Sequence, residues 1–246
     1  MFKPKSERLD GLSKKFAQNI VALEQIFQSN VGVYIDYANV RPWATKLGWN
    51  IDLQRLKTFL SSFDNIKTVK FFDGILAGDA KSEKAGKEKL KIFKAGFISK
   101  PVKIMKKSID FTSIKPNSPD LLEQFIRKCL LLKYNLETVE YLNKKFKEMN
   151  TGGMYYLEDR KCNFDVEIGT TMMLDFEHGT IDTFILWSGD SDFADVVTKL
   201  LSAGKKVVLF ATVRKVSKEL NDLQTKGLLI FDIQKIREFI CWVNQI

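Results

Sequence analysis

Short apolar runs alternate with amphipathic segments along the chain, a pattern that predicts strands alternating with helices. Phe184 to Trp187 is a continuous apolar run of the length expected for a strand buried on both faces of a parallel sheet. The turn SGDSD at residues 188–192 follows, and apolar side chains then recur at helical spacing. Gly204 stands where a C-terminal cap belongs. This stretch therefore predicts a strand, a tight loop and a helix.

The same alternation runs through most of the chain. The other predicted strands are Val31 to Ile35, Lys67 to Phe72, Phe97 to Met105, Lys206 to Ala211 and Leu228 to Asp232. The other predicted helices are one docking helix after a frayed start within residues 1–30, Ile51 to Phe63, Ser82 to Ala95, Phe164 to Phe176 and a C-terminal helix from Gln234. In the lysine-rich helix we expect Leu90 and Phe93 to face the core. Pro101 indicates an edge strand, because proline cannot donate to the ladder.

The alternation is lost between Ser108 and Arg160. Ser118-Pro119-Asp120 starts a helix with a wide apolar stripe, and Leu136 to Met149 is a second helical stretch. We therefore expect a helical insertion at about residues 108–160 within a domain of residues 31–246, preceded by an N-terminal extension at 1–30. Such an insertion acts as a lid, as a dimer surface or simply as added core.

Composition limits the class of protein. With 246 residues and 45% apolar content, the chain suits one generous soluble domain. No apolar run approaches the roughly 20 residues that span a bilayer, and residues 1–30 lack the apolar core of a signal peptide, so we expect a cytoplasmic protein without a membrane segment. Cys129, Cys162 and Cys241 lack the spacing of a zinc site or a disulfide framework. The single histidine, His178, argues against a Ser-His-Asp or Cys-His mechanism.

Acidic residues stand at three predicted strand or helix ends: Asp36, Asp165, and the pair Asp190 and Asp192. The carboxyl ends of neighbouring parallel strands meet at one edge, so we expect these side chains to share a cleft. Carboxylates held so close repel each other unless a cation neutralises them, and Mg²⁺ or Mn²⁺ prefers such oxygen ligands. The alternative reading is structural, because aspartate also caps helices and closes turns.

Positive charge is concentrated in one segment. The formal net charge is +9, and ten lysines face two glutamates between Lys81 and Lys107. We expect Lys84, Lys87 and Lys91 to lie on the exposed face of a helix. A positive field confined to one element suits a polyanion such as a nucleic acid. The alternative is an ordinary solvated helix face.

Several motifs together resemble a known family. YIDYAN, NFDVEIGTTMMLD and ILWSGDSDFADVVTKLLSAGKKVVLF resemble the NYN domain, a PIN-like group of metal-dependent ribonucleases, in particular its LabA-like bacterial branch. FFDG at residues 71–74 resembles the second strand end of that family. The resemblance implies a PIN-like three-layer α/β/α sandwich with a central parallel sheet. It also implies an acidic Mg²⁺ or Mn²⁺ site that hydrolyses RNA phosphodiester bonds. A homodimer fits this picture.

The resemblance also implies roles for particular residues. It assigns catalysis to Asp36, Asp165, Asp190 and Asp192, the first three as metal ligands and Asp192 as the residue that orients the attacking water. It assigns substrate binding to Asn39 and Ser191, to which the charge pattern adds Lys84, Lys87 and Lys91 of the lysine-rich helix.

Two positions complicate the match. The family has a Lys-Gly-x-Asp run before the middle helix, whereas Lys161 to Asp165 contains no glycine and one residue more. Asp175 also matches an acid common in the family, but helical geometry turns it away from Asp165.

Other classes remain to be separated from a nuclease. A non-catalytic RNA-binding or regulatory module would keep the fold and the basic helix. A phosphatase of the haloacid dehalogenase type needs a second aspartate two positions after its nucleophile, and Asp36-Tyr37-Ala38 lacks one. No Gly-x-x-x-x-Gly-Lys-Ser/Thr run is present for a nucleotide-binding P-loop.

Overall fold

The computed structural model describes residues 1–43, 48–108, 137, 141, 156–161, 163–212 and 215–243. The chain divides into two compact units. The first comprises Met1–Val102 and Cys162–Ile246, and the second is Lys103–Lys161. The first unit carries the central sheet and all the acidic residues predicted to form the site.

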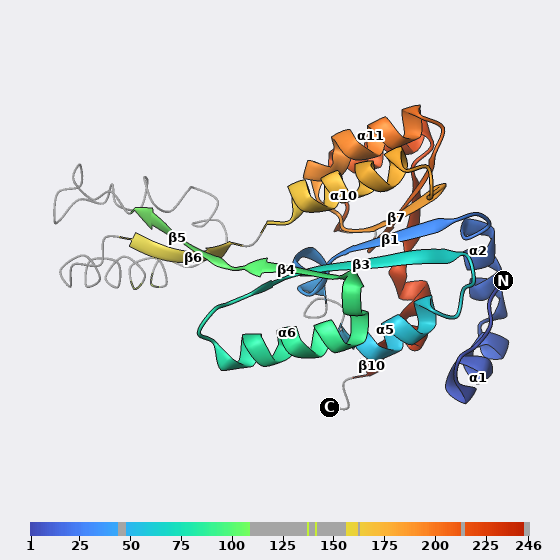
Figure 1. Ribbon diagram of the computed structural model, residues 1–246, viewed down its shortest axis with the longest axis horizontal. Coiled ribbons are helices and arrows are strands. Elements are labelled where there is room, and N and C mark those ends of the chain that lie inside the picture. The colour runs from blue at the N-terminus through green and yellow to red at the C-terminus, as the bar shows by residue number, and fades with distance from the viewer. Residues whose placement is uncertain are drawn as a thin grey trace. The chain divides into compact units, whose positions relative to one another are not determined.

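A six-stranded sheet forms the centre of the first unit (Figure 1). All of its neighbouring strands are parallel. In spatial order the strands are β4 (Phe97–Pro101), β3 (Ile66–Ile75), β1 (Val31–Asp36), β7 (Thr183–Trp187), β8 (Lys206–Ala211) and β9 (Leu229–Asp232). Every residue of β1 and β7 is buried, as their continuous apolar sequences predict. Pro101 ends β4, which is an edge strand as expected.

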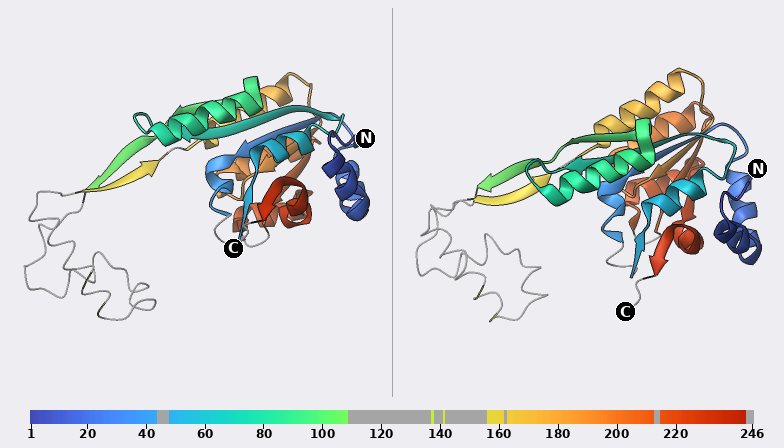
Figure 2. Two further views of the ribbon diagram at one scale, coloured as in Figure 1. Left: turned by 90° about the horizontal axis from the view of Figure 1, so that it is seen from below. Right: turned by 60° about the horizontal axis from the view of Figure 1, so that its bottom comes forward.

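Helices cover both faces of this sheet, which confirms the predicted three-layer α/β/α arrangement (Figure 2). One face carries α5 (Leu53–Leu60), α6 (Ala80–Phe93) and α13 (Arg237–Ile240). The other face carries α10 (Asp165–Glu177) and α11 (Ala194–Ser202). Gly204 follows α11 with a positive φ of 75°, as expected for a C-terminal cap.

Further helices, 3₁₀ turns and a strand pair complete the first unit. Its remaining helices are α1 (Glu7–Lys15), α2 (Ala17–Ile26), α3 (Tyr37–Val40) and α12 (Lys218–Asp222), with 3₁₀ turns η1 (Lys94–Gly96), η2 (Ser191–Phe193), η4 (Leu223–Lys226) and η5 (Ile233–Ile236). An antiparallel pair is formed by β2 (Trp49–Ile51) and β10 (Cys241–Val243). Within the described residues, no helix is long and apolar enough to cross a lipid bilayer.

The two ends of the chain differ from expectation. The predicted single N-terminal helix is two, because the chain leaves helical geometry at Phe16, where φ is −118°. The start is not frayed: the Phe2 ring packs 4.9 Å from that of Phe63. The predicted C-terminal helix gives way to the strand β10 after Ile240, and pairing with β10 also places Ile51 in a strand before α5 begins.

The lysine-rich helix presents a different inner face from the one expected. Phe93 is buried, but Leu90 is 53% exposed. The inner face passes through Gly86, where a Cβ atom would lie 2.6 Å from Cδ1 of Ile75. It also includes Lys89, which pairs with the buried carboxylate of Asp73. This ion pair turns the helix toward Lys89 and leaves Leu90 in solvent.

The second unit contains an antiparallel ribbon of β5 (Lys103–Ser108) and β6 (Tyr156–Lys161). The predicted strand Phe97 to Met105 is thus divided between two sheets, and residues 156–160, assigned to a helical insertion, form a strand. β5 and β6 lie far apart in the sequence, so the local pattern does not reveal that they pair with each other. The helices predicted from Ser118 and from Leu136 to Met149 lie outside the described residues, apart from Glu137 and Tyr141.

Candidate active site

The site begins where β1 and β7 end side by side. Ile35 pairs with Trp187 in the parallel register, so Asp36 and Ser188 leave the sheet at the same edge. The connections from these two strands run to opposite faces of the sheet, to α5 and to α11. Such a reversal of strand order is the point at which open parallel sheets place their ligands.

Asp36 is buried, with 5% of its surface exposed. Its Oδ1 accepts a hydrogen bond from the backbone N–H of Asn39 at 3.3 Å and so caps α3. Its Oδ2 accepts one from the Ser188 hydroxyl at 3.2 Å. Burial raises the pKa of Asp36 to about 6; the two hydrogen bonds lower it, and the charges of Asp165 and Asp190 raise it.

Asp165 opens α10 on the other side of the same edge. Its backbone N–H donates to Oδ1 of Asn163 at 2.9 Å. Burial, and then the negative charges of Asp190 and Asp192, raise the pKa of Asp165 to about 6, against a lowering contribution from Asn163. Three strand and helix ends therefore bring their carboxylates into one electrostatic neighbourhood.

Asp190 both caps a turn and belongs to this neighbourhood. Its Oδ1 accepts the backbone N–H of Asp192 at 3.3 Å and the hydroxyl of Ser191 at 3.5 Å. Asp192 itself is exposed on η2. The structural and the chemical interpretations of the turn are thus compatible, because capping occupies one oxygen of Asp190 and leaves the other available.

The donor set suits a hard divalent ion, but no preformed cage is present. Over the ranges that the structure describes, no group of three or more His, Cys, Asp or Glu side chains is arranged to hold a metal ion. Mg²⁺ commonly retains several waters and takes one or two carboxylates together with substrate phosphates. Asp36, Asp165 and Asp190 offer the oxygen donors for that mode of binding, and their repulsion is of the kind a cation relieves.

Backbone contacts that the sequence did not reveal hold the central loop. The amide oxygen of Asn39 accepts the backbone N–H of Gly189 at 3.3 Å. The backbone N–H of Ser217 donates to the Gly189 carbonyl at 2.9 Å. A Cβ atom on Gly189 would lie 1.8 Å from the carbonyl oxygen of Lys215, so only glycine fits. Ser188 and the segment after β8 therefore support the site. In the sequence, only Gly189 indicated that another segment packs closely against this loop.

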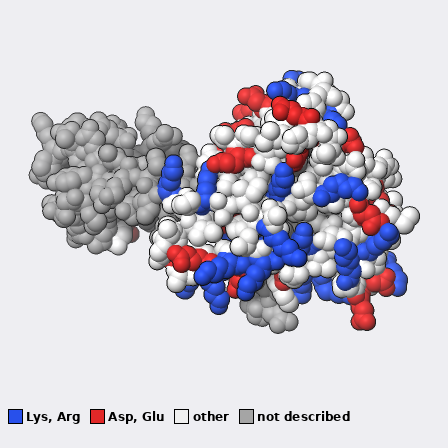
Figure 3. Space-filling view, in the orientation of Figure 1, with Lys and Arg blue, Asp and Glu red and all other residues white. Residues whose placement is uncertain are grey.

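The lysines of α6 divide into two groups. Lys84, Lys87 and Lys91 are exposed, and Figure 3 shows Lys and Arg side chains gathered over α6. Lys89 instead points inward, where its Nζ lies 2.5 Å from Oδ2 of Asp73 and 5.4 Å from the centroid of the Tyr37 ring. Asp73 stands at the carboxyl end of β3, so this buried pair joins α6 to the edge where β1 ends.

Asp175 takes no part in the carboxylate cluster. Its Oδ2 accepts the hydroxyl of Tyr34 at 2.6 Å and pairs with Nζ of Lys70 at 2.9 Å. Burial, and then the hydrogen bond to Asp175 and its negative charge, raise the pKa of Tyr34. The expectation that α10 turns Asp175 away from Asp165 is confirmed.

The chain is similar to a known domain family and to a solved structure. The sequence model of the NYN domain matches residues 30–228. No curated protein matches the chain. One solved structure that resembles it is the crystal structure of a protein of unknown function from Vibrio parahaemolyticus, with 15% sequence identity and a TM-score of 0.48. The match covers 86% of this chain and 95% of that one. This similarity gives no information about the function of the chain.

Proposed function

Because the chain belongs to the NYN domain family, a family of PIN-like nucleases, we propose that it is a Mg²⁺- or Mn²⁺-dependent ribonuclease. The observation that carries this proposal is the gathering of Asp36, Asp165, Asp190 and Asp192 at the carboxyl edge of the sheet. The pKa values of Asp36 and Asp165 are raised in part by their acidic neighbours. Carboxylates gathered in this way would bind a divalent cation, and the cation would bind a phosphodiester group of the substrate.

Asp36, Asp165 and Asp190 would hold the metal ion. When bound, the ion supplies charge stabilisation at the phosphoryl group and activates water as the attacking group. Ser188 holds the Asp36 carboxylate in place, and the cap to Asn39 fixes it from the other side. Asp192, exposed at the mouth of the cluster, orients the attacking water by accepting its proton at a carboxylate oxygen.

Asn39 and Ser191 flank the path of the substrate. The Asn39 amide oxygen is engaged by Gly189, so its NH₂ group is the part that faces a phosphate or carboxylate. The Ser191 hydroxyl lies beside Asp190. The exposed lysines Lys84, Lys87 and Lys91 would bind backbone phosphates of RNA at more distant positions.

A second candidate is a non-catalytic RNA-binding module. The exposed lysines of α6 favour it, because they can bind RNA phosphates whether or not the carboxylates hold a metal ion. Both candidates bind RNA, and they differ in whether RNA is cut.

The test is cleavage of single-stranded RNA by wild type, Asp190→Asn and Asp195→Asn. Asn retains capping ability at position 190, and Asp195 is an exposed acid in the first turn of α11 that controls for lost charge. With Mn²⁺, we expect Asp190→Asn to lose at least about 100-fold in cleavage rate while retaining RNA binding, and Asp195→Asn to cleave normally. Binding without cleavage in the wild type would favour the non-catalytic module. Equal loss in both variants would remove Asp190 from catalysis.

The cytoplasmic location and the homodimer remain predictions. The LabA-like assignment within the family also remains a prediction.

A further inference from the structure

Three lysines from separate parts of the chain lie close together at the C-terminal end of α6. Lys94 begins η1 directly after this helix, Lys57 lies in the last turn of α5, and Lys5 precedes α1. The Nζ atom of Lys57 lies 6.0 Å from the centroid of the ring of Phe93, the residue before Lys94. We call Lys5, Lys57 and Lys94 the lysine triad.

The N-terminal segment brings Lys5 to this place. The backbone N–H of Lys3 donates to the carbonyl of Ser62 at 2.6 Å, just beyond the end of α5. Ser6 caps α1. Lys5 is therefore held between two fixed points beside the last turn of α5, where Lys57 lies.

No acidic side chain among the described residues neutralises the lysine triad. Burial lowers the pKa of Lys57, and the positive charges of Lys5 and Lys94 lower it further. None of the three ammonium groups forms an ion pair within the part of the chain that the structure describes. Like charges held together in this way cost free energy, which a bound anion would relieve.

Lys94 also adopts a strained backbone conformation. Its φ is 51° and its ψ is −128°, and it is the only described residue other than glycine with a positive φ. An L-residue rarely adopts this conformation, whereas glycine does so at little cost. The turn after α6 thus favours glycine at position 94 and gives no reason for a lysine there. What the lysine contributes is its charge, and strain of this kind is a reason to look for a function.

α6 connects the lysine triad to the edge of the sheet that carries the carboxylates. This helix follows the carboxyl end of β3 and leads to the amino end of β4, so it runs from one edge of the sheet to the other (Figure 1). Its length is about 21 Å. The exposed lysines Lys84, Lys87, Lys91 and Lys94 are three or four residues apart and therefore lie along one side. Figure 3 shows that Lys and Arg side chains continue from α6 toward α5 on the same face.

We propose that the lysine triad binds a backbone phosphate of the RNA, several nucleotides away from the phosphate held at the carboxylates. The inference deepens the proposed function and rests on it, because that function supplies RNA as the ligand. The exposed lysines of α6 would hold the strand between the two places. Ammonium groups bind phosphates as point charges and do not distinguish bases, so the triad would select RNA by length and not by sequence.

The first experiment measures which lysines RNA protects from acetylation by N-hydroxysuccinimide acetate, with mass spectrometry as the readout. The RNA is an oligouridylate of about 12 nucleotides, in EDTA. We expect it to slow acetylation of Lys5 and Lys94 at least about 3-fold, and to leave Lys199 and Lys226 unchanged. Failure of the RNA to bind, or binding that leaves Lys5 and Lys94 unprotected, would overturn the proposal. Protection by inorganic tripolyphosphate but not by RNA would overturn it too, and would indicate a site for a small polyanion.

The second experiment separates charge from stability. Lys94→Gly relieves the backbone strain and should raise the melting temperature, so weaker RNA binding in this background cannot come from unfolding. In Lys57→Gln/Lys94→Gly, fluorescence anisotropy with the same RNA should show at least about 5-fold weaker binding and a slope of log K against log salt reduced by about 1.4. The control Lys199→Ala/Lys226→Ala removes two exposed charges elsewhere and should bind normally. Wild-type affinity in the first variant, or an equal loss in the control, would contradict the assignment.

Neither experiment requires cleavage, so this inference and the proposed function can fail separately. Protection of the lysine triad without Mn²⁺-dependent cleavage would sink the proposed ribonuclease and leave the phosphate contact intact. Cleavage of RNA with an unprotected triad would do the reverse.

Discussion

The hydroxyl of Ser188 donates a hydrogen bond to Oδ2 of Asp36 at 3.2 Å, across 152 residues of sequence. The same serine oxygen accepts the backbone N–H of Asp190 at 3.3 Å. One small side chain thus connects the end of β1 to the acidic loop after β7. The Asp36 carboxylate and the backbone of Asp190 are thereby tied to each other through Ser188.

Asp36→Asn should change the pH dependence of stability. Burial raises the pKa of Asp36 from 3.8 to about 6, because the charged carboxylate is disfavoured in the folded protein. The contribution of Asp36 to the free energy of unfolding is therefore fully present below about pH 3.8, and it is lost as pH rises through 6 and the buried side chain ionises. Asn stays neutral and retains the cap. In EDTA at about pH 7.5, urea unfolding should show Asp36→Asn to be more stable than wild type by about 1–3 kcal/mol, with little difference at about pH 4. A difference independent of pH would contradict the assigned burial effect.

Gly189→Ala should destabilise the protein. The new methyl group would meet the backbone of Lys215, which cannot move without displacing the segment after β8. We expect a loss of about 1–3 kcal/mol in unfolding free energy. Gly169→Ala is the matched control, because nothing lies within 4 Å of that position in α10, and it should add about 0.5–1 kcal/mol. Equal effects of the two substitutions would show that the loop after β7 is free to adjust.

Replacing Lys84, Lys87 and Lys91 with alanine should weaken RNA binding and flatten its salt dependence. Three lost contacts to single-stranded RNA reduce the slope of log K against log salt by about 2. The control removes the same charge from the other side of the protein, at Lys199, Lys218 and Lys226.

Fluorescence anisotropy of a labelled RNA at several salt concentrations measures both slopes. The same reduction in the control would indicate a general effect of net charge. An unchanged slope in the α6 variant would remove this helix from the interface.

Asp175→Asn should separate structure from catalysis. It weakens the pair with Lys70 and the hydrogen bond from Tyr34, at a cost of about 1–3 kcal/mol. The rise in melting temperature caused by Mn²⁺ should nevertheless be retained, whereas Asp190→Asn should lose it. Loss of the Mn²⁺ effect in Asp175→Asn would place this acid in the metal site after all.

The sequence predicted the sheet because strands buried on both faces leave uninterrupted apolar runs, as in β1 and β7. It also predicted which strand and helix ends carry acids, and the structure brings Asp36, Asp165, Asp190 and Asp192 together. Their catalytic roles stay predictions. What it missed were partnerships between distant elements: nothing local indicates that Lys89 pairs with Asp73, or that this pair leaves Leu90 in solvent.

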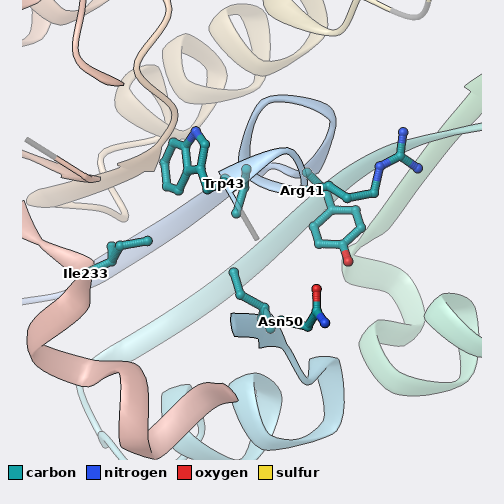
Figure 4. A pocket seen from close by; sticks show the side chains of 7 residues that line it. Arg41, Trp43, Asn50 and Ile233 are labelled. Carbon is teal, nitrogen blue, oxygen red and sulfur yellow. The ribbon is translucent and has the colours of Figure 1, made fainter. Parts of the chain in front are cut away.

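The supporting contacts of the site could not be predicted for the same reason. Ser188 looks like an ordinary turn residue until the register of β1 against β7 is known. A small pocket lined by residues of α3, β2 and η5 (Figure 4) likewise depends on the pairing of β2 with β10. The hydrophobic pattern within one segment does not indicate which distant segment it contacts.

The four acids are held by different elements of the fold. Asp36 is the last residue of the central strand β1, whereas Asp165 lies in the first turn of α10. A displacement of α10 that broke the contacts of Asp175 with Tyr34 and Lys70 would also move Asp165 away, while every strand kept its partners. Loss of the proposed metal binding and unfolding of the sheet would then be separate events.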